Sequence, residues 1–318
     1  METVSRNIAA ALCGVEHPVF QAGMAGIAGP KLAAAVSNAG GLGHLGGLRQ
    51  PPSKLRAWIR ETRRLTDRPF GVNLVPVYGG PEVFEAQLRV VFEERPKVLS
   101  LFYGDFADVI PRAKAAGLVV MVQVGSVAEA GKAFSDGADI VVAQGAEGGG
   151  HLHYGKIGLM SLLPAVVDVA KGRPVLAAGG ITDRTDVEAA VRLGAHGVWV
   201  GTAFVATNES LAHDIYKRRL VEASTDDTEY RTGYSFGWKY GTPHRVIPNR
   251  DKWNLVRFVG GGARVVDKPA IAEKLSLFCG QGVGKITEIL PSAERVARLA
   301  AGFGANQAIR THVGRAAW

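Results

Sequence analysis

The sequence predicts an α/β protein: a closed (β/α)8 barrel with a smaller added subdomain near the carboxyl end of the chain. Short apolar runs rich in β-branched residues alternate with amphipathic stretches, the pattern of a parallel sheet buried on both faces. Eight such units are complete by residue 206, as a closed barrel requires. A doubly wound open sheet is the alternative. It is disfavoured because no GxGxxG follows the first apolar run.

Each unit begins with a short apolar run that ends in a turn, which predicts a strand. The predicted strands cover residues 17–24, 40–47, 68–75, 97–104, 118–125, 139–146, 173–180 and 196–204. The predicted helices cover residues 29–40, 52–65, 106–117, 126–138 and 182–195. The last of these has Thr182 or Asp183 as its N-cap and ends at Gly194.

The pattern changes after residue 206. Residues 211–224 predict a helix, and the next forty or so residues mix aromatic residues, glycine and proline with little periodicity. We expect the barrel to comprise residues 1–206 and 279–318, and residues 207–278 to form the subdomain over its C-terminal mouth. Four aromatic residues of the subdomain are candidates for a lid or for its own small core: Tyr234, Phe236, Trp238 and Tyr240. A final helix in residues 284–303 is expected to return to the barrel.

The composition narrows the class of protein. With 318 residues, 47% hydrophobic and 21% charged, the chain is typical of a globular protein with a large core. Two cysteines provide neither a disulfide framework nor metal-ligand spacing, which favours the cytoplasm. We see no signal peptide and no apolar run near the roughly 18 residues of a membrane helix. The net charge of +8 is scattered, which favours attraction of anions over nucleic-acid binding.

Glycine-rich segments end the last two predicted strands, at residues 177–190 and 200–204. Glycine lets backbone N–H groups approach a phosphate closely. The loops after strands seven and eight are also the usual phosphate site of this barrel. These segments therefore predict a phosphate-binding site, although glycines that only permit tight turns would look the same.

Three amide side chains lie in or at the ends of predicted strands: Asn73, Gln144 and Gln123. An amide offers a donor and an acceptor to the edge of a planar heterocycle. For Asn73 and Gln144 we favour a ligand contact over a bond to their own loop. For Gln123 the two interpretations are equally good.

His151 follows three glycines after the sixth predicted strand. A neutral imidazole there can take a proton from a carbon acid or stabilise a developing anion, although a loop histidine packed on a neighbour would have the same sequence. His153 is a competing candidate. Glu147 is a candidate to orient either histidine or to hold a cofactor's hydroxyls, and His44 is a further candidate to face the site. We find no Ser-His-Asp, G-x-S-x-G or HExxH pattern, and we expect no metal.

Six segments in this order, PVFQAGM, AAAVSNAGGLG, LTDRPFGVNL, AQGAEGGGH, AAGGI and GTAF, resemble the nitronate monooxygenase family, formerly called 2-nitropropane dioxygenases. The resemblance covers about residues 15–310. It implies an FMN-dependent TIM barrel whose phosphate is held by Gly179, Gly180, Gly201 and Thr202. It also implies contacts of the flavin ring and ribityl chain with Gly23, Met24, Asn73, Gln144, Gly149 and Gly150. It implies that His151 is the catalytic base.

The resemblance implies oxidation of alkyl nitronates with O₂. We expect a monomer or homodimer. Similar motifs occur in FMN enoyl-acyl-carrier-protein reductases and quinone reductases, so an NAD(P)H-dependent reductase of an enoyl thioester or quinone is the alternative. A barrel without flavin, such as a phosphate-binding aldolase or isomerase or a non-catalytic binding protein, is a third. A Schiff-base aldolase is disfavoured because no predicted strand holds an interior lysine.

Overall fold

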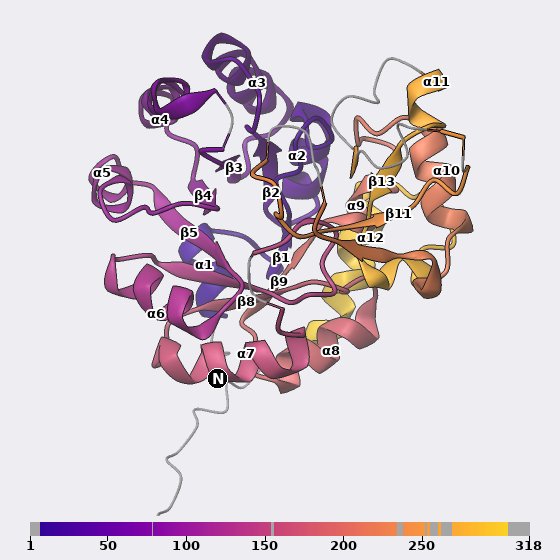
Figure 1. The fold of residues 1–318 in the computed structure, drawn as a ribbon. Coiled ribbons are helices and arrows are strands. Elements are labelled where there is room, and N and C mark those ends of the chain that lie inside the picture. Colours follow the sequence, from indigo (N-terminus) through magenta and orange to yellow (C-terminus); the bar gives the residue numbers. More distant parts are fainter. Residues whose placement is uncertain are drawn as a thin grey trace, which may run out of the picture.

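The structure of the chain is a computed structural model. It describes residues 7–77, 79–153, 156–233, 238–251, 253–254, 260–261 and 269–304. Figure 1 shows strands at the centre of the molecule with helices around them, and a second group of elements, coloured orange, to one side.

The central sheet has eight parallel strands in the order β1-β9-β8-β6-β5-β4-β3-β2. They are β1 (Val19–Gln21), β2 (Gly43–Gly46), β3 (Phe70–Leu74), β4 (Val98–Phe102), β5 (Val119–Val124), β6 (Ile140–Gln144), β8 (Val175–Ala178) and β9 (Gly197–Val200). A parallel bridge between Phe20 and Leu42 links β1 to the residue before β2. The bridge closes the sheet, so the predicted barrel is confirmed and the open sheet is excluded.

The five predicted interstrand helices are present as α2 (Pro30–Asn38), α3 (Pro52–Leu65), α5 (Val109–Ala115), α6 (Val127–Ser135) and α8 (Arg184–Arg192). The N-cap of α8 is Asp183, whose carboxylate accepts a hydrogen bond from the Asp186 N–H at 3.0 Å. The prediction missed α4 (Gly80–Glu94) and α7 (Leu159–Ala170). Glycines and a proline at the start of α4, and Pro164 inside α7, resemble loop signals and hid both helices.

The barrel interior is filled by side chains that alternate along the strands with those facing the helices. The inner cluster includes Phe20, Met121, Leu176 and Trp199. Ala9 and Cys13 of α1 (Ile8–Cys13) belong to the same cluster. Because α1 packs on these inner side chains, it plugs one end of the barrel and leaves the opposite end for a ligand.

A second sheet contains β10 (Glu229–Arg231), β11 (His244–Ile247), β13 (Ser276–Phe278) and β12 (Gly260–Gly261). β7 (Gly150–His151), from the loop after barrel strand β6, pairs with β11 and so joins this sheet to the barrel. Helices α10 (Asp214–Glu222) and α11 (Pro269–Ala272) accompany it, and α9 (Thr202–Val205) follows the last barrel strand. That residues 207–278 form a subdomain separate from the barrel is still a proposal.

The chain returns to the barrel after the second sheet. The 3-10 helix η3 (Gln281–Lys285) leads to α12 (Ser292–Ala300), which packs against α2 and α8. α12 lies within residues 284–303, where the sequence predicts a final helix that returns to the barrel.

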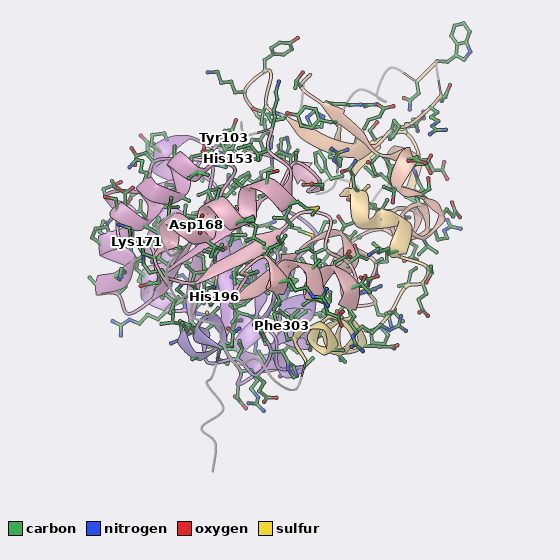
Figure 2. All side chains as sticks on the ribbon, turned by 90° about the horizontal axis from the view of Figure 1, so that it is seen from below. Tyr103, His153, Asp168, Lys171, His196 and Phe303 are labelled. Atoms are coloured by element: carbon green, nitrogen blue, oxygen red, sulfur yellow. The ribbon has the colours of Figure 1, made fainter. Side chains whose placement is uncertain are left out.

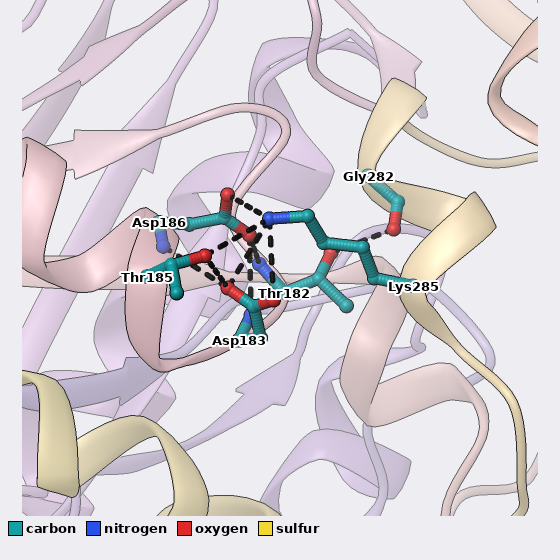
Figure 3. A network of polar contacts seen from close by, with 6 residues as sticks. All are labelled: Thr182, Asp183, Thr185, Asp186, Gly282 and Lys285. Carbon is teal, nitrogen blue, oxygen red and sulfur yellow. Dashed lines mark hydrogen bonds and ion pairs between the residues drawn. The ribbon is translucent and has the colours of Figure 1, made fainter.

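Lys285 joins the returning segment to the start of α8 (Figure 3). Its Nζ lies 2.6 Å from Oδ1 of Asp186 and 3.2 Å from Asp183, and the Thr182 hydroxyl donates to the Gly282 carbonyl at 3.0 Å. Burial opposes the charged form of Lys285, but hydrogen bonds to Asp186 and Asp183 outweigh it and raise the pKa of Lys285. The network therefore fixes the loop that follows β8.

We expect Lys285→Met to lower the free energy of unfolding by about 0.5–1 kcal/mol at pH 7, since these charges are partly exposed. Burial acts to raise the pKa of Asp183, but hydrogen bonds, including that from Lys285, hold it below its usual value. Stability gained from a lowered carboxyl pKa is present above the unfolded pKa of about 4 and is lost as the pH falls through the folded value.

Thermal unfolding of wild type and variant from pH 7 to pH 2.5 measures this effect, and the difference between them should shrink in acid. Lys31→Met is the matched control, because Lys31 is exposed on α2 and makes no ion pair among the described residues. A difference that stays constant over this pH range would contradict the account.

Candidate active site

A cavity of about 440 Å³ lies at the carboxyl ends of the barrel strands, within the size range of ligand pockets. It lies at the end of the barrel opposite α1. Every residue that the family resemblance assigns to FMN or to catalysis lines it: Gly23, Met24, Asn73, Gln144, Gly149, Gly150, His151, Gly179, Gly180, Gly201 and Thr202. The fold therefore brings these residues together, while their individual roles remain predictions. Gln123 also lines the cavity.

The glycines after β8 and β9 form one wall. Gly179 and Gly180 have φ angles of 107° and 75°, a left-handed backbone that favours glycine. Gly201 has an ordinary φ of −104°, and a Cβ built there would meet only Ala22 and Met24, both at 3.7 Å. A methyl group at Gly201, which lines the cavity, would therefore make only ordinary contacts with its neighbours.

Asn73 and Gly23 form the wall near β3. The Asn73 amide donates to the hydroxyl and the carbonyl of Ser100, at 3.1 and 3.3 Å. A Cβ on Gly23 would lie 2.1 Å from the Cβ of Asn73. The absence of a side chain at Gly23 is therefore what allows Asn73 to reach its position.

Gln144 is the last residue of β6, and only one of its two amide atoms is hydrogen-bonded among the described residues. Its Nε2 donates to the His151 carbonyl at 3.3 Å, while its Oε1 is buried without a hydrogen-bond partner among the described residues. A buried acceptor without a partner is costly unless a ligand or water supplies a donor. This atom is a candidate acceptor for a ligand N–H or O–H.

The glycines before His151 have a structural reason of their own. A Cβ on Gly149 would lie 2.4 Å from the Gly280 nitrogen, and Gly150 has a φ of 75°. The Gln281 N–H donates to the Glu147 carbonyl at 2.9 Å. This hydrogen bond holds the loop before His151 against residues 279–281. The glycines therefore permit close backbone packing between the loop and residues 279–281.

His151 is held by β7, where it lies opposite His244 of β11. Its ring stacks on Trp238, with centroids 3.8 Å apart and planes 12° apart, and lies 5.1 Å from Phe278. Burial, with smaller effects of His244 and Arg49, lowers the pKa of His151 well below its usual value. The imidazole is therefore neutral at pH 7.

His153 lies outside this cavity. Its Nδ1 is 2.7 Å from a Glu129 carboxylate oxygen, and its ring centroid is 5.6 Å from that of Tyr103. Figure 2 labels His153 and Tyr103 close together. Burial acts to raise the pKa of Glu129, but His153 and the Gly125 N–H outweigh it and lower that pKa. His153 lines a separate small cavity with Glu129.

Neither of two further candidates, Glu147 and His44, is among the residues that line the cavity. Glu147 orients neither histidine, because both carboxylate oxygens accept from the Leu159 N–H, at 2.9 and 3.1 Å, and so cap α7. His44 does not line the cavity: it is fully buried inside the barrel with its ring 4.6 Å from that of Trp199. Burial lowers the pKa of His44 to about 3, more than the Leu42 and Gln21 backbone raises it.

The proposed aromatic lid is described in part. Trp238 lines the cavity, whereas Tyr240 is 80% exposed, and Tyr234 and Phe236 lie outside the described residues. Tyr216 and Phe278 also line the cavity and were not foreseen, because nothing in their local pattern sets them apart. The Tyr216 hydroxyl donates to the Phe278 carbonyl.

Arg49 was also missed. It follows β2 and lines the cavity with a φ of 65°. Gly46 and Gly47 precede it in the sequence, and an arginine next to a turn gives no catalytic signal by itself.

The described residues contain no group of three or more histidine, cysteine, aspartate or glutamate side chains placed to bind a metal ion. In the same part of the chain, no helix has both the length and the apolar character that crossing a membrane requires.

A closed (β/α)8 barrel with a glycine-lined cavity and a neutral histidine at its C-terminal end defines a barrel enzyme. The family model for nitronate monooxygenase matches residues 6–81 and 77–254. The chain belongs to the nitronate monooxygenase family, and it is an oxidoreductase.

Two relatives and one solved structure are similar to this chain. The chain is 38% identical over 270 residues to a (3aS,4S,5R,7aS)-5-hydroxy-7a-methyl-1-oxo-octahydro-1H-indene-4-carboxyl-CoA dehydrogenase of Rhodococcus jostii, covering 85% of this chain and 73% of that one. It is 33% identical to a nitronate monooxygenase of Pseudomonas aeruginosa, covering 89% and 95%. A solved mutant of FabK from Thermotoga maritima superposes with a TM-score of 0.82 at 36% identity, covering 95% and 96%.

Proposed function

We propose that the cavity binds FMN. Two observations support the fit: Gly201 lines the cavity without a side chain, and Gln144 presents a buried acceptor without a partner among the described residues. The phosphate would be held by Gly179, Gly180, Gly201 and Thr202. The ring and ribityl chain would contact Gly23, Met24, Asn73, Gln144, Gly149 and Gly150. FMN supplies redox chemistry when bound.

We propose that the enzyme oxidises alkyl nitronates with O₂. The observation that carries this is the neutral His151 imidazole, buried at the cavity wall and stacked on Trp238. A neutral imidazole accepts the proton from the carbon next to a nitro group and so produces the nitronate at the site. The mainly apolar cavity wall limits water around that proton, and Trp238 holds the ring in one orientation.

Oxygen uptake tests the proposal. The purified, FMN-loaded protein should consume O₂ when given an alkyl nitronate, without NADH or NADPH. No uptake with nitronates of several chain lengths would overturn it.

A second function is favoured by the relative at 38% identity, which is named a CoA thioester dehydrogenase. In this alternative the protein exchanges hydride between NAD(P)H and a CoA thioester or quinone. NADH or NADPH oxidation that depends on added enoyl-CoA or quinone, without nitronate-dependent O₂ uptake, would establish this function instead.

A further inference from the structure

The turn after β2 is held rigidly on both sides of Arg49. The Gln87 amide of α4 donates to the carbonyls of Gly47 and Gln50, at 2.9 and 2.7 Å. The Gln50 N–H donates to the Gly47 carbonyl at 3.0 Å, and Leu48 packs in a buried cluster with Val75 and Phe102. The position of the Arg49 backbone is therefore set by its surroundings.

Arg49 adopts a strained backbone in this turn. Its φ of 65° lies in the left-handed region, which is unfavourable for a residue with a Cβ. Glycine would adopt this conformation without strain. A strained residue that its surroundings hold in place points to a role at a functional site.

Arg49 also determines the charge of the cavity. Among the described residues that line it, Arg49 alone carries a formal charge, and no aspartate or glutamate is among them. A guanidinium is planar, permanently charged and matched to two oxygens of a planar anion. His151, which also lines the cavity, is neutral and so adds no second charge to it.

We propose that Arg49 is the anion-binding residue of this cavity, and that its guanidinium binds the paired oxygens of a planar oxyanion substrate. The nitronate as that substrate rests on the proposed function, with its two nitro oxygens on Arg49 and its carbon on the His151 side. Arg49 thereby selects anionic over neutral substrates.

Calorimetric titration of the FMN-loaded protein with sodium nitrate tests this without turnover, with chloride holding the ionic strength constant. Wild type should bind nitrate saturably, and Arg49→Gln should bind it at least tenfold more weakly. Arg49→Lys should bind nitrate with intermediate affinity, because lysine keeps the positive charge but lacks the planar guanidinium that matches two oxygens. Glycine adopts the left-handed backbone without strain. Arg49→Gly therefore replaces Arg49→Gln in the titration if the glutamine variant folds poorly.

Arg95→Gln is the matched control, since Arg95 also has a left-handed backbone, with a φ of 48°, and is exposed away from the cavity. Nitrate binding with the wild-type Kd in Arg49→Gln or Arg49→Gly, or no saturable binding to wild type, would overturn the inference. If Arg49 binds nitrate but no nitronate is oxidised, the proposed function fails and the anion site stands. If nitronates are oxidised with an unchanged KM in these variants, the function stands and the inference fails.

Discussion

Replacing His151 with alanine should lower kcat/KM for a neutral nitroalkane by about 10²–10⁴-fold, the usual contribution of a general base. The bound FMN should be unchanged, because the His151 ring stacks on Trp238 and lies 5.1 Å from Phe278, away from the glycines that follow β8 and β9. For a nitronate prepared in advance with base, the same variant should show a much smaller loss of kcat/KM. Oxygen uptake with the two forms of the same substrate measures this difference.

His153→Ala is the control, because His153 pairs with Glu129 outside the main cavity and should leave nitroalkane turnover nearly unchanged. Burial lowers the pKa of His151 well below 6.5, so the base stays unprotonated in mild acid. The acidic limb of kcat/KM for nitroalkane should therefore lie below pH 6.5 and disappear in the His151 variant. Normal nitroalkane turnover by His151→Ala would show that the base assignment is wrong.

Gly201→Ala should weaken FMN binding at least tenfold while leaving the fold intact. The added methyl meets Ala22 and Met24 at 3.7 Å, an ordinary contact, and the φ of −104° suits alanine. The methyl would instead occupy cavity space where we propose the phosphate lies. Quenching of FMN fluorescence on titration of apoprotein gives the Kd.

Gly131→Ala provides the comparison, because a Cβ at this position of α6 meets nothing within 4 Å. It should bind FMN as wild type does. Thermal unfolding without FMN should show Gly201→Ala within a few degrees of wild type. An unchanged Kd in Gly201→Ala would place the phosphate elsewhere.

The barrel follows from the sequence because apolar runs and caps are local signals. All eight strands lie in predicted segments, and the Asp183 cap begins α8 where expected. The same logic failed for α4 and α7, where proline and glycine lie inside or at the start of true helices. Packing against the barrel outweighs these weak local preferences.

The cavity lining was foreseen where it depends on residues that end barrel strands. It was missed where it depends on long-range contacts. No local pattern shows that β7 pairs with β11, that Glu147 caps α7, or that Gln87 holds the turn of Arg49. His44 shows the converse, because a strand-end position suggested the site while its register turns the ring into the barrel.

The central claim is that a nitronate alone reduces the bound flavin. Under anaerobic conditions the purified yellow protein is mixed with an alkyl nitronate in one cell and with NADH or NADPH in another, while flavin absorbance is recorded. We expect a change in the flavin spectrum with the nitronate alone. Bleaching only with NADH or NADPH would contradict it and identify a reductase.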